Sequence, residues 1–229
     1  MPTSIVYNTD CLDYMRGLPD GYFDLAICDP PYGLDKSSTH GRGKLRDRIL
    51  NTGHIQQWDV RPSQEYFDEL RRVSKQQVIW GGNYFDLPPC RCFVVWDKQQ
   101  PWENFSQAEF AWTSFDKPAK LVTIPKSGRE QKIHPTQKPV ELYAYILRTF
   151  AMGGGKILDT HLGSGSSRIA AYKMGYDFVG CEINSTYYEL QEERFRRECL
   201  GEVKINNSQK SAVGISNGGF LFRRLRQLC

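Results

Sequence analysis

The sequence of 229 residues lacks any long uninterrupted hydrophobic run, and no stretch approaches the ~18 apolar residues of a membrane-spanning helix. Its amino terminus also lacks the basic start and apolar core of a secretory signal peptide. We therefore expect a cytoplasmic protein with no membrane partner. A composition of 40% hydrophobic and 24% charged residues is typical of a folded globular domain, and it excludes collagen-like and disordered classes.

Cysteine and histidine are too scattered along the chain to predict a metal site. Among the seven cysteines, Cys90 and Cys92 are close together, but C-x-C is not a zinc-finger spacing. The four histidines add no H-x3–5-H pair. We therefore expect no bound metal and reduced thiols.

An excess of one charge is absent from most of the chain. Residues 201–229 hold five basic residues and one acidic residue, which accounts for the whole net charge of +4. Residues 1–200 hold equal numbers of basic and acidic residues, so global charge is weak support for a nucleic-acid partner. The basic tail has little regular pattern, and we expect no regular fold there.

Short apolar runs alternate with amphipathic segments through most of the chain. This alternation predicts an α/β fold with a largely parallel sheet. Strands are predicted at 4–8, 23–29, 77–80, 92–96, 109–113, 121–124, 156–159 and 177–182. Helices are predicted around 12–18 and over 64–74, 139–150, 168–174 and 186–199.

The segment 157–167 reads as a strand, a glycine-rich turn and the start of a helix. Gly163 and Gly165 allow a ligand to approach the backbone closely. Glu182 follows Gly163 by 19 residues, near the spacing of about 20 that places a carboxylate on ribose hydroxyls. Arg168 stands where a dinucleotide-binding turn has its third glycine. This disfavours NAD and favours an adenosine ligand without phosphates, such as S-adenosylmethionine.

The tetrapeptide Asp29-Pro30-Pro31-Tyr32 directly ends the buried run 23–29. Two prolines cannot continue a strand ladder, so the chain leaves the sheet at the edge where α/β proteins keep their active sites. Asp29 and the Pro30 carbonyl can accept both hydrogens of an exocyclic amine, and Tyr32 offers a face for stacking a base flipped out of the duplex. Alone the tetrapeptide is a plain turn, but beside the glycine turn it predicts methyl transfer to an amine.

Four blocks in this order combine the two motifs over about residues 4–198: TDCLDYMRGLPDGYFDLAICDPPYG, WDVRPSQEYFDELRRVSKQQVIWGGNYF, HPTQKPVEL, and ILDTHLGSGSSRIAA with FVGCEIN. The order resembles the S-adenosylmethionine-dependent DNA amino-methyltransferases of bacteria and phages, in their circularly permuted beta-type arrangement. In that family the D-P-P-Y motif precedes the cofactor turn. The resemblance implies a Rossmann-like fold with a mostly parallel, doubly wound sheet and an antiparallel edge strand.

The resemblance also implies roles for individual residues. The catalytic residues would be Asp29, Pro30, Pro31 and Tyr32. The cofactor contacts would be Asp10 and Cys11 at the adenine, Glu182 at the ribose, Thr136 and Lys138 near the methionine carboxylate, and Asp159, His161, Gly163, Ser164 and Gly165 in the turn. The family usually has Pro and Phe where this chain has Thr160 and His161, so we expect His161 to replace an aromatic packing residue near the cofactor.

The same resemblance implies one methyltransferase domain over residues 1–200. Its catalytic part would span about 4–96, a target-recognition insertion about 97–133, and a cofactor-binding part about 134–198. The basic tail would follow this domain.

The first position of the tetrapeptide bears on the target base. The adenine enzymes of the family mostly have Asp there, as at Asp29, and the cytosine-N4 enzymes mostly have Ser. We predict a site-specific enzyme that methylates the N6 amine of a flipped adenine in duplex DNA, as in restriction-modification systems. A cytosine-N4 enzyme and a catalytically impaired DNA-binding homologue are the alternatives, and the motif order disfavours a protein or RNA methyltransferase. A homodimer and a restriction endonuclease partner are left open.

A glycine-loosened basic loop, residues 36–48, directly follows the tetrapeptide. We expect Lys44, Arg46 and Arg48 to contact DNA phosphates. Replacing these three residues with Ala is expected to weaken DNA binding and to flatten its dependence on salt, because fewer counterions are released. Binding titrations at several salt concentrations measure this slope, and an unchanged slope would contradict the assignment.

Overall fold

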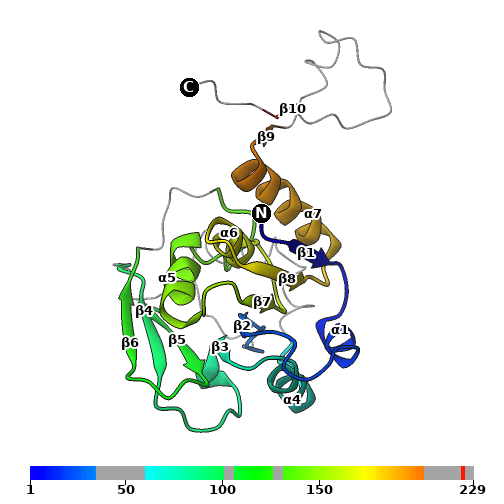
Figure 1. Ribbon diagram of the computed structural model, residues 1–229. Helices are drawn as coiled ribbons and strands as arrows, with labels where there is room; N and C mark the ends of the chain where they lie inside the picture. The colour runs from blue at the N-terminus through cyan, green and yellow to red at the C-terminus, as the bar shows by residue number, and fades with distance from the viewer. Residues whose placement is uncertain (35–59, 101–105, 126–130, 204–222, 225–229) are drawn as a thin grey trace.

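The computed structural model describes residues 1–34, 60–100, 106–125, 131–203 and 223–224, and an eight-stranded sheet forms its centre (Figure 1). In chain order the strands are β1 (Ser4–Tyr7), β2 (Leu25–Cys28), β3 (Gln77–Trp80), β4 (Phe93–Asp97), β5 (Ala108–Thr113), β6 (Lys120–Thr123), β7 (Lys156–Asp159) and β8 (Asp177–Cys181). In space their order is β1-β8-β7-β2-β3-β5-β4-β6. All eight predicted strands are present, and the α/β class is confirmed.

The direction of the strands agrees with a mostly parallel sheet. Among the described strands, neighbours are parallel except at β5, which is antiparallel to both β3 and β4. The prediction of an antiparallel strand is confirmed, but its predicted position at the edge of the sheet is wrong. The antiparallel strand β5 is an interior strand, and the edge strands are β1 and β6. Residues 98–107 join β4 to β5, and a link that short favours an antiparallel neighbour over a parallel crossover.

The sheet carries helices on both faces, as predicted for a doubly wound fold (Figure 1). The helices are α1 (Cys11–Arg16), α4 (Gln64–Val73), α5 (Val140–Phe150), α6 (Ser166–Lys173) and α7 (Ser185–Phe195), with the short 3-10 turn η2 (Gly82–Tyr84) and the π-helical turn η3 (Arg196–Leu200). Helices α5 and α6 pack against one another, and α1 packs against α4. The helix predicted over 186–199 thus begins at Ser185 and changes to π geometry after Phe195.

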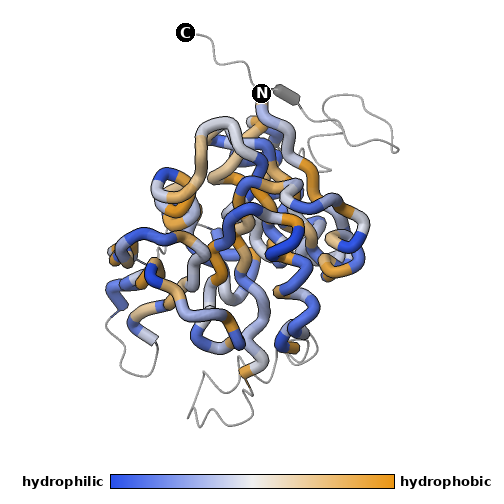
Figure 2. The backbone as a smooth tube through the Cα atoms, turned by 60° about the horizontal axis from the view of Figure 1, so that its bottom comes forward, coloured by the Kyte–Doolittle hydropathy of each residue, from blue (hydrophilic) through white to orange (hydrophobic). Residues whose placement is uncertain are grey.

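Two hydrophobic cores lie on opposite faces of the sheet. Successive strand residues alternate between them: Leu25 and Ile27 join the core with α5 and α6, and Ala26 and Cys28 join the core with α4. This split follows from the two-residue period of a strand. Over the described residues, hydrophobic and hydrophilic stretches alternate along the chain (Figure 2). Because both faces are covered, β2 is buried throughout its length.

Parallel pairing brings the two sequence motifs to the same edge of the sheet. Strand β2 pairs with β7, with Leu25 opposite Ile157 and Ala26 opposite Leu158. Asp29 and the glycine turn therefore follow neighbouring strands at their carboxyl ends. Strands β8 and β1 continue the sheet beyond β7, so Glu182 and the start of α1 lie at that edge too.

The segment 97–133 is a part of the sheet in its described residues. Ala108–Thr113 and Lys120–Thr123 are its strands β5 and β6, as their apolar runs predict. Residues 101–105 and 126–130 lie outside the described residues. The target-recognition role of this segment stays a prediction.

The basic loop and most of the tail are outside the part of the chain that the structure describes. This holds for Lys44, Arg46 and Arg48, and for residues 204–222 and 225–229. Two short strands, β9 (Glu202–Val203) and β10 (Arg223–Arg224), pair antiparallel within the tail. Across the described ranges, no helix combines the length and the apolar character needed to cross a membrane.

Buried arginines tie α6 and α7 to the sheet. Arg168, at the position of the missing third glycine, donates to the Ser4 Oγ at 2.9 Å and to the Gln191 Oε1 at 2.9 Å. Arg194 of α7 donates to the Ser164 carbonyl at 3.0 Å and to the Ser166 Oγ at 2.9 Å. The helix thereby supports the glycine turn from behind, because Ser164 lies within that turn.

Replacing Arg194 with Met is expected to lower the free energy of unfolding by about 3 kcal/mol, because the carbonyl and hydroxyl that it satisfies would stay buried without it. The matched control is Arg196→Met, two residues further along the chain and 45% exposed, with an expected loss of about 0.5 kcal/mol or less. Chemical denaturation of both variants measures the difference. Equal losses would show that the contacts of Arg194 contribute nothing specific.

Candidate functional site

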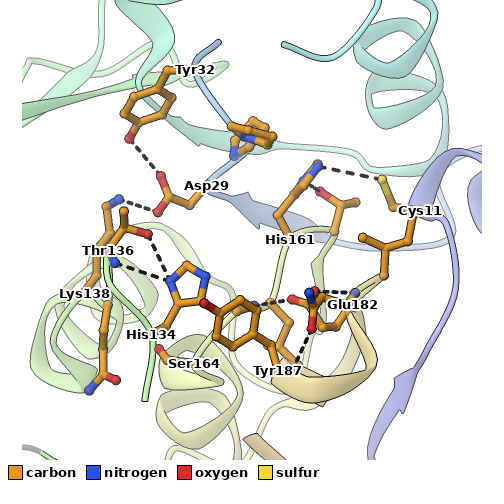
Figure 3. Close-up of a pocket in the computed structure, with 18 of the residues that line it drawn as sticks. Cys11, Asp29, Tyr32, His134, Thr136, Lys138, His161, Ser164, Glu182 and Tyr187 are labelled. Carbon is orange, nitrogen blue, oxygen red and sulfur yellow. Dashed lines mark hydrogen bonds and ion pairs between the residues drawn. The ribbon is translucent and has the colours of Figure 1, made fainter. Parts of the chain in front are cut away.

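A cavity of about 520 Å³ opens at the carboxyl ends of the parallel strands (Figure 3). Its walls come from segments far apart in the sequence: the start of α1, the Asp29–Tyr32 tetrapeptide, the 134–138 segment, the glycine turn, and the residues after β8. Its volume falls within the range of about 300–1,000 Å³ that is common for small-molecule sites. The cavity therefore joins the two motifs that the sequence separates by about 130 residues.

Asp29 lies at one end of the cavity between two hydrogen-bond donors (Figure 3). The Tyr32 hydroxyl donates to its Oδ1 at 2.8 Å, and the Lys138 ammonium contacts its Oδ2. Burial, followed by the charge of Asp29, raises the pKa of the Tyr32 phenol far above its usual value. Tyr32 is therefore a neutral donor at any physiological pH. All four residues of the tetrapeptide line the cavity.

The ring of Tyr32 is held in place by its neighbours after β3. It stacks on Tyr84 with 4.9 Å between the ring centroids. Gly81 has φ +68°, and a Cβ at that position would lie 2.1 Å from a carbon of the Tyr32 ring. Only glycine fits there, so this turn leaves room for the aromatic face.

Glu182 fixes a carboxylate beside the glycine turn. Its Oε2 accepts from the Gly163 backbone N–H at 2.8 Å, and its Oε1 accepts from the Asn184 backbone N–H at 2.8 Å. Burial raises the pKa of this carboxyl above its ordinary value, which the two backbone donors partly offset. Glu182, Gly163 and Ser164 all line the cavity. A carboxylate of fixed orientation therefore lies beside the backbone of the glycine turn on the cavity wall.

Asp159 and Gly165 lie behind the cavity wall. The Asp159 Oδ2 accepts from the Ser167 hydroxyl at 2.5 Å, and its Oδ1 accepts from the His161 backbone N–H at 3.0 Å. Burial raises the pKa of the Asp159 carboxyl to about 7. Gly165 takes φ +74° at the start of α6 and packs against Gln191. These two residues shape the turn, and neither lines the cavity.

A chain of polar contacts holds the His161 imidazole. The Tyr66 hydroxyl lies 2.6 Å from the Thr160 Oγ1, which lies 3.0 Å from the His161 Nδ1. The His161 Nε2 lies 4.0 Å from the Cys11 Sγ (Figure 3). Burial lowers the pKa of His161 to about 4, so the ring is neutral at pH 7. Burial also raises the pKa of Cys11, which stays a thiol.

The start of α1 forms the wall beside His161. Asp10 and Cys11 both line the cavity. The Asp10 Oδ1 also caps the helix, accepting from the backbone N–H groups of Leu12 at 2.8 Å and Asp13 at 3.2 Å. Capping fixes where the helix begins and so holds Cys11 at the wall.

The 134–138 segment, which precedes α5, forms another wall of the cavity. The Thr136 Oγ1 lies 3.1 Å from the His134 Nδ1, and the His134 ring meets Tyr187 edge-on with 4.3 Å between centroids. Thr136 and Lys138 line the cavity as predicted. The Lys138 ammonium, however, contacts Asp29, at the tetrapeptide end. The expected place beside a cofactor carboxylate thus differs from the contact that the structure shows.

The cavity residues that sequence reasoning missed include Glu109, His134 and Tyr187. Glu109 was identifiable in principle, because it is a charged residue next to an otherwise apolar run that forms β5. His134 is the first residue of the HPTQKPVEL block, which places it beside the cofactor contacts predicted there. Tyr187 carries no such signal, because its position depends on how α7 packs. Within the described ranges, no group of three His, Cys, Asp or Glu residues could hold a metal ion.

Comparisons with known proteins agree with this geometry. Residues 79–193, half of the chain, match the family model N6_N4_Mtase, described as DNA methylase. The Type II methyltransferase M2.MboI of Moraxella bovis is 23% identical over 92% of this chain and 94% of its own length.

Solved structures share the fold. The PvuII DNA methyltransferase (cytosine-N4-specific) has a TM-score of 0.60 at 16% identity, covering 93% of this chain and 92% of that one. The M1.HpyAVI–SAM complex has a TM-score of 0.55 at 20% identity, covering 83% of this chain and 98% of that one. Together with the parallel sheet, these similarities confirm the Rossmann-like methyltransferase fold.

Replacing His161 with Phe is expected to weaken the fall in the free energy of unfolding at low pH. The folded protein holds His161 neutral, so stability is lost as the pH falls from about 6.5 towards about 4, where the unfolded chain binds a proton more readily. We expect the free energy of unfolding of the wild type to fall by about 1 to 2 kcal/mol through this group. This is less than the full pKa shift implies, because the ring borders the cavity. Denaturation at pH 7.5 and pH 5 measures it, and an identical pH dependence in H161F would contradict the assignment.

Proposed function

Since this chain belongs to the N6_N4_Mtase family of DNA methylases, we propose that it transfers a methyl group from S-adenosylmethionine to the N6 amine of adenine in duplex DNA. The observation that carries the proposal is the shared cavity, with Asp29 at one end and Glu182 beside the glycine turn. A donor and an acceptor bound at these two places would meet within one cavity, which converts the transfer into an effectively unimolecular step.

The residues of the cavity fit the cofactor. Glu182, held by two backbone N–H groups, has its remaining lone pairs available for the ribose hydroxyls. The neutral His161 and the Asp10–Cys11 wall would contact the adenine. Thr136 is the candidate near the methionine end. When bound, S-adenosylmethionine supplies a methyl group on a sulfonium, from which a neutral thioether leaves readily.

The tetrapeptide would orient the target amine. Asp29 and the Pro30 carbonyl accept its two hydrogens, which directs the nitrogen lone pair away from them and towards the donor. The Asp29 Oδ1 now accepts the Tyr32 hydroxyl, so the amine would replace that bond or share it. Tyr32 stacks on the flipped base, and stacking returns about 1–3 kcal/mol of the cost of unpairing it.

Adenine is the proposed target because Asp29 occupies the first position of the tetrapeptide. The structurally similar PvuII enzyme is named as specific for cytosine N4, which makes N4-cytosine the second candidate. Both amines present the same pair of hydrogens to Asp29 and Pro30. The product base therefore decides between the two.

The remaining parts of the domain have proposed roles in DNA binding. The basic loop 36–48 would contact phosphates, and the connections within 97–133 would read the target sequence around strands β5 and β6. Residues 1–200 form one domain in this proposal.

Incubating unmethylated genomic DNA with the protein and S-adenosylmethionine is expected to yield N6-methyladenine, measured by nucleoside mass spectrometry. Asp29→Asn should lower the rate by about 100-fold or more, because one charged acceptor of the reacting amine is lost. The matched control is Asp24→Asn. Asp24 precedes β2 and bonds Lys75 and the Lys156 backbone N–H outside the cavity, so this variant should retain its activity.

Two results would overturn parts of the proposal. N4-methylcytosine would keep the mechanism and correct the target base. No methylated base on mixed genomic DNA, with a folded protein, would reject the function.

A further inference from the structure

Four side chains of alternating charge run from the tetrapeptide into the sheet. The Lys138 ammonium contacts the Asp29 Oδ2, and it lies 3.0 Å from the Glu109 Oε2. The Lys98 ammonium lies 2.6 Å from the Glu109 Oε1. Each inner member therefore has an opposite charge on both sides.

This charge chain is withdrawn from water. The side chains of Lys138 and Lys98 are 3% and 8% exposed, and the Lys138 ammonium lies 5.4 Å from the centre of the Trp80 ring. Burial would lower the pKa of Lys138, but Asp29 and Glu109 outweigh it and raise the pKa above its usual value. Burial would raise the pKa of Glu109, but Lys138 and Lys98 lower it to about 2. All inner members are therefore charged at pH 7.

The reversed direction of β5 explains how Glu109 reaches this place. Glu109 is the second residue of β5 and pairs with Trp96 near the end of β4. Because β5 is antiparallel, its first residues lie at the edge where the parallel strands end. A strand parallel to β4 would instead bring its last residues to that edge.

We infer that Lys138 is a positioning residue that holds the carboxylate of Asp29 towards the target amine, with Glu109 fixing Lys138 from the other side. The inference rests on the proposed function. It assigns Lys138 to the acceptor end of the cavity rather than to the methionine carboxylate. It also gives Glu109, in the segment expected to recognise the target sequence, a part in aligning the reacting groups.

One ion pair and one hydrogen bond fix the orientation of the Asp29 carboxylate. Its Oδ2 faces Lys138 and its Oδ1 faces Tyr32 (Figure 3). A buried ammonium with a second carboxylate partner cannot swing to solvent without leaving Glu109 unpaired, and leaving a buried charge unpaired is costly. Holding Lys138 still therefore holds Asp29 still.

The test compares Lys138→Met with Lys98→Met. Both variants remove a buried ammonium that pairs with Glu109, but only Lys138 contacts Asp29. For Lys138→Met we expect kcat to fall about 100-fold, the effect of a misplaced catalytic group. The KM for S-adenosylmethionine and the calorimetric Kd for S-adenosylhomocysteine should change by no more than about threefold. Lys98→Met should lower kcat less, and Lys138→Arg should recover part of the loss.

Several outcomes would overturn the inference. One is a kcat within about threefold of the wild type in Lys138→Met. Another is a much weaker affinity for S-adenosylhomocysteine with kcat retained at saturating cofactor, which would make Lys138 a cofactor ligand. If Lys138→Met does not fold, Glu109→Gln tests the same contact chain from Glu109 through Lys138 to Asp29. Its kcat should fall while its affinity for S-adenosylhomocysteine stays the same. An unchanged kcat would reject the inference.

A structural readout separates this inference from the proposed function. Crystal structures of the wild type and Lys138→Met should show the Asp29 carboxylate turned to a new position in the variant. If Lys138→Met does not crystallise, Glu109→Gln takes its place, and its Lys138 and Asp29 should both be displaced. If the wild type methylates no DNA, the proposed function fails, and the position of Asp29 still decides the role of Lys138. An undisplaced carboxylate would refute that role.

Discussion

The site depends on the parallel pairing of β2 with β7 at the centre of the sheet. This pairing joins two strands that are far apart in the sequence, and it places Asp29 and the glycine turn at one edge. Parallel strands all present their carboxyl ends together, so the register of two residue pairs decides where both motifs lie. The helices on the two faces bury β2 at every position and β7 at every position after Lys156, and they thereby disfavour a shift of register.

The two ends of the cavity hold their carboxylates by different means. Glu182 is held by backbone N–H groups of the turn and of the segment after β8, which move only if the fold moves. Asp29 is held by two side chains, the Lys138 ammonium, which also pairs with Glu109, and the Tyr32 hydroxyl. Under the proposed function, this difference would suit a donor site that keeps one shape and an acceptor site in which an incoming amine replaces the Tyr32 hydroxyl.

The glycine turn of this chain differs from the resembled family at Thr160 and His161, and the structure accommodates both residues. Each polar group that replaces an apolar one has a partner, because the Thr160 hydroxyl lies between Tyr66 and the His161 imidazole. The ring stays neutral and meets Tyr66 edge-on at 5.3 Å, as an aromatic packing residue would. The His161 ring therefore packs against Tyr66 within the turn and has a polar edge beside Cys11.

By itself, the sequence determined the strands, the helices, the tetrapeptide, the glycine turn and the Glu182 carboxylate, because each depends on local periodicity or spacing. Tertiary structure alone decided that β5 is an interior strand, that Asp159 and Gly165 lie behind the cavity wall, and that Lys138 faces Asp29. Glu109 shows the reason. Its role requires a reversed strand, a partner 29 residues later in the chain and an aspartate 80 residues earlier, and no local pattern encodes contacts between such distant segments.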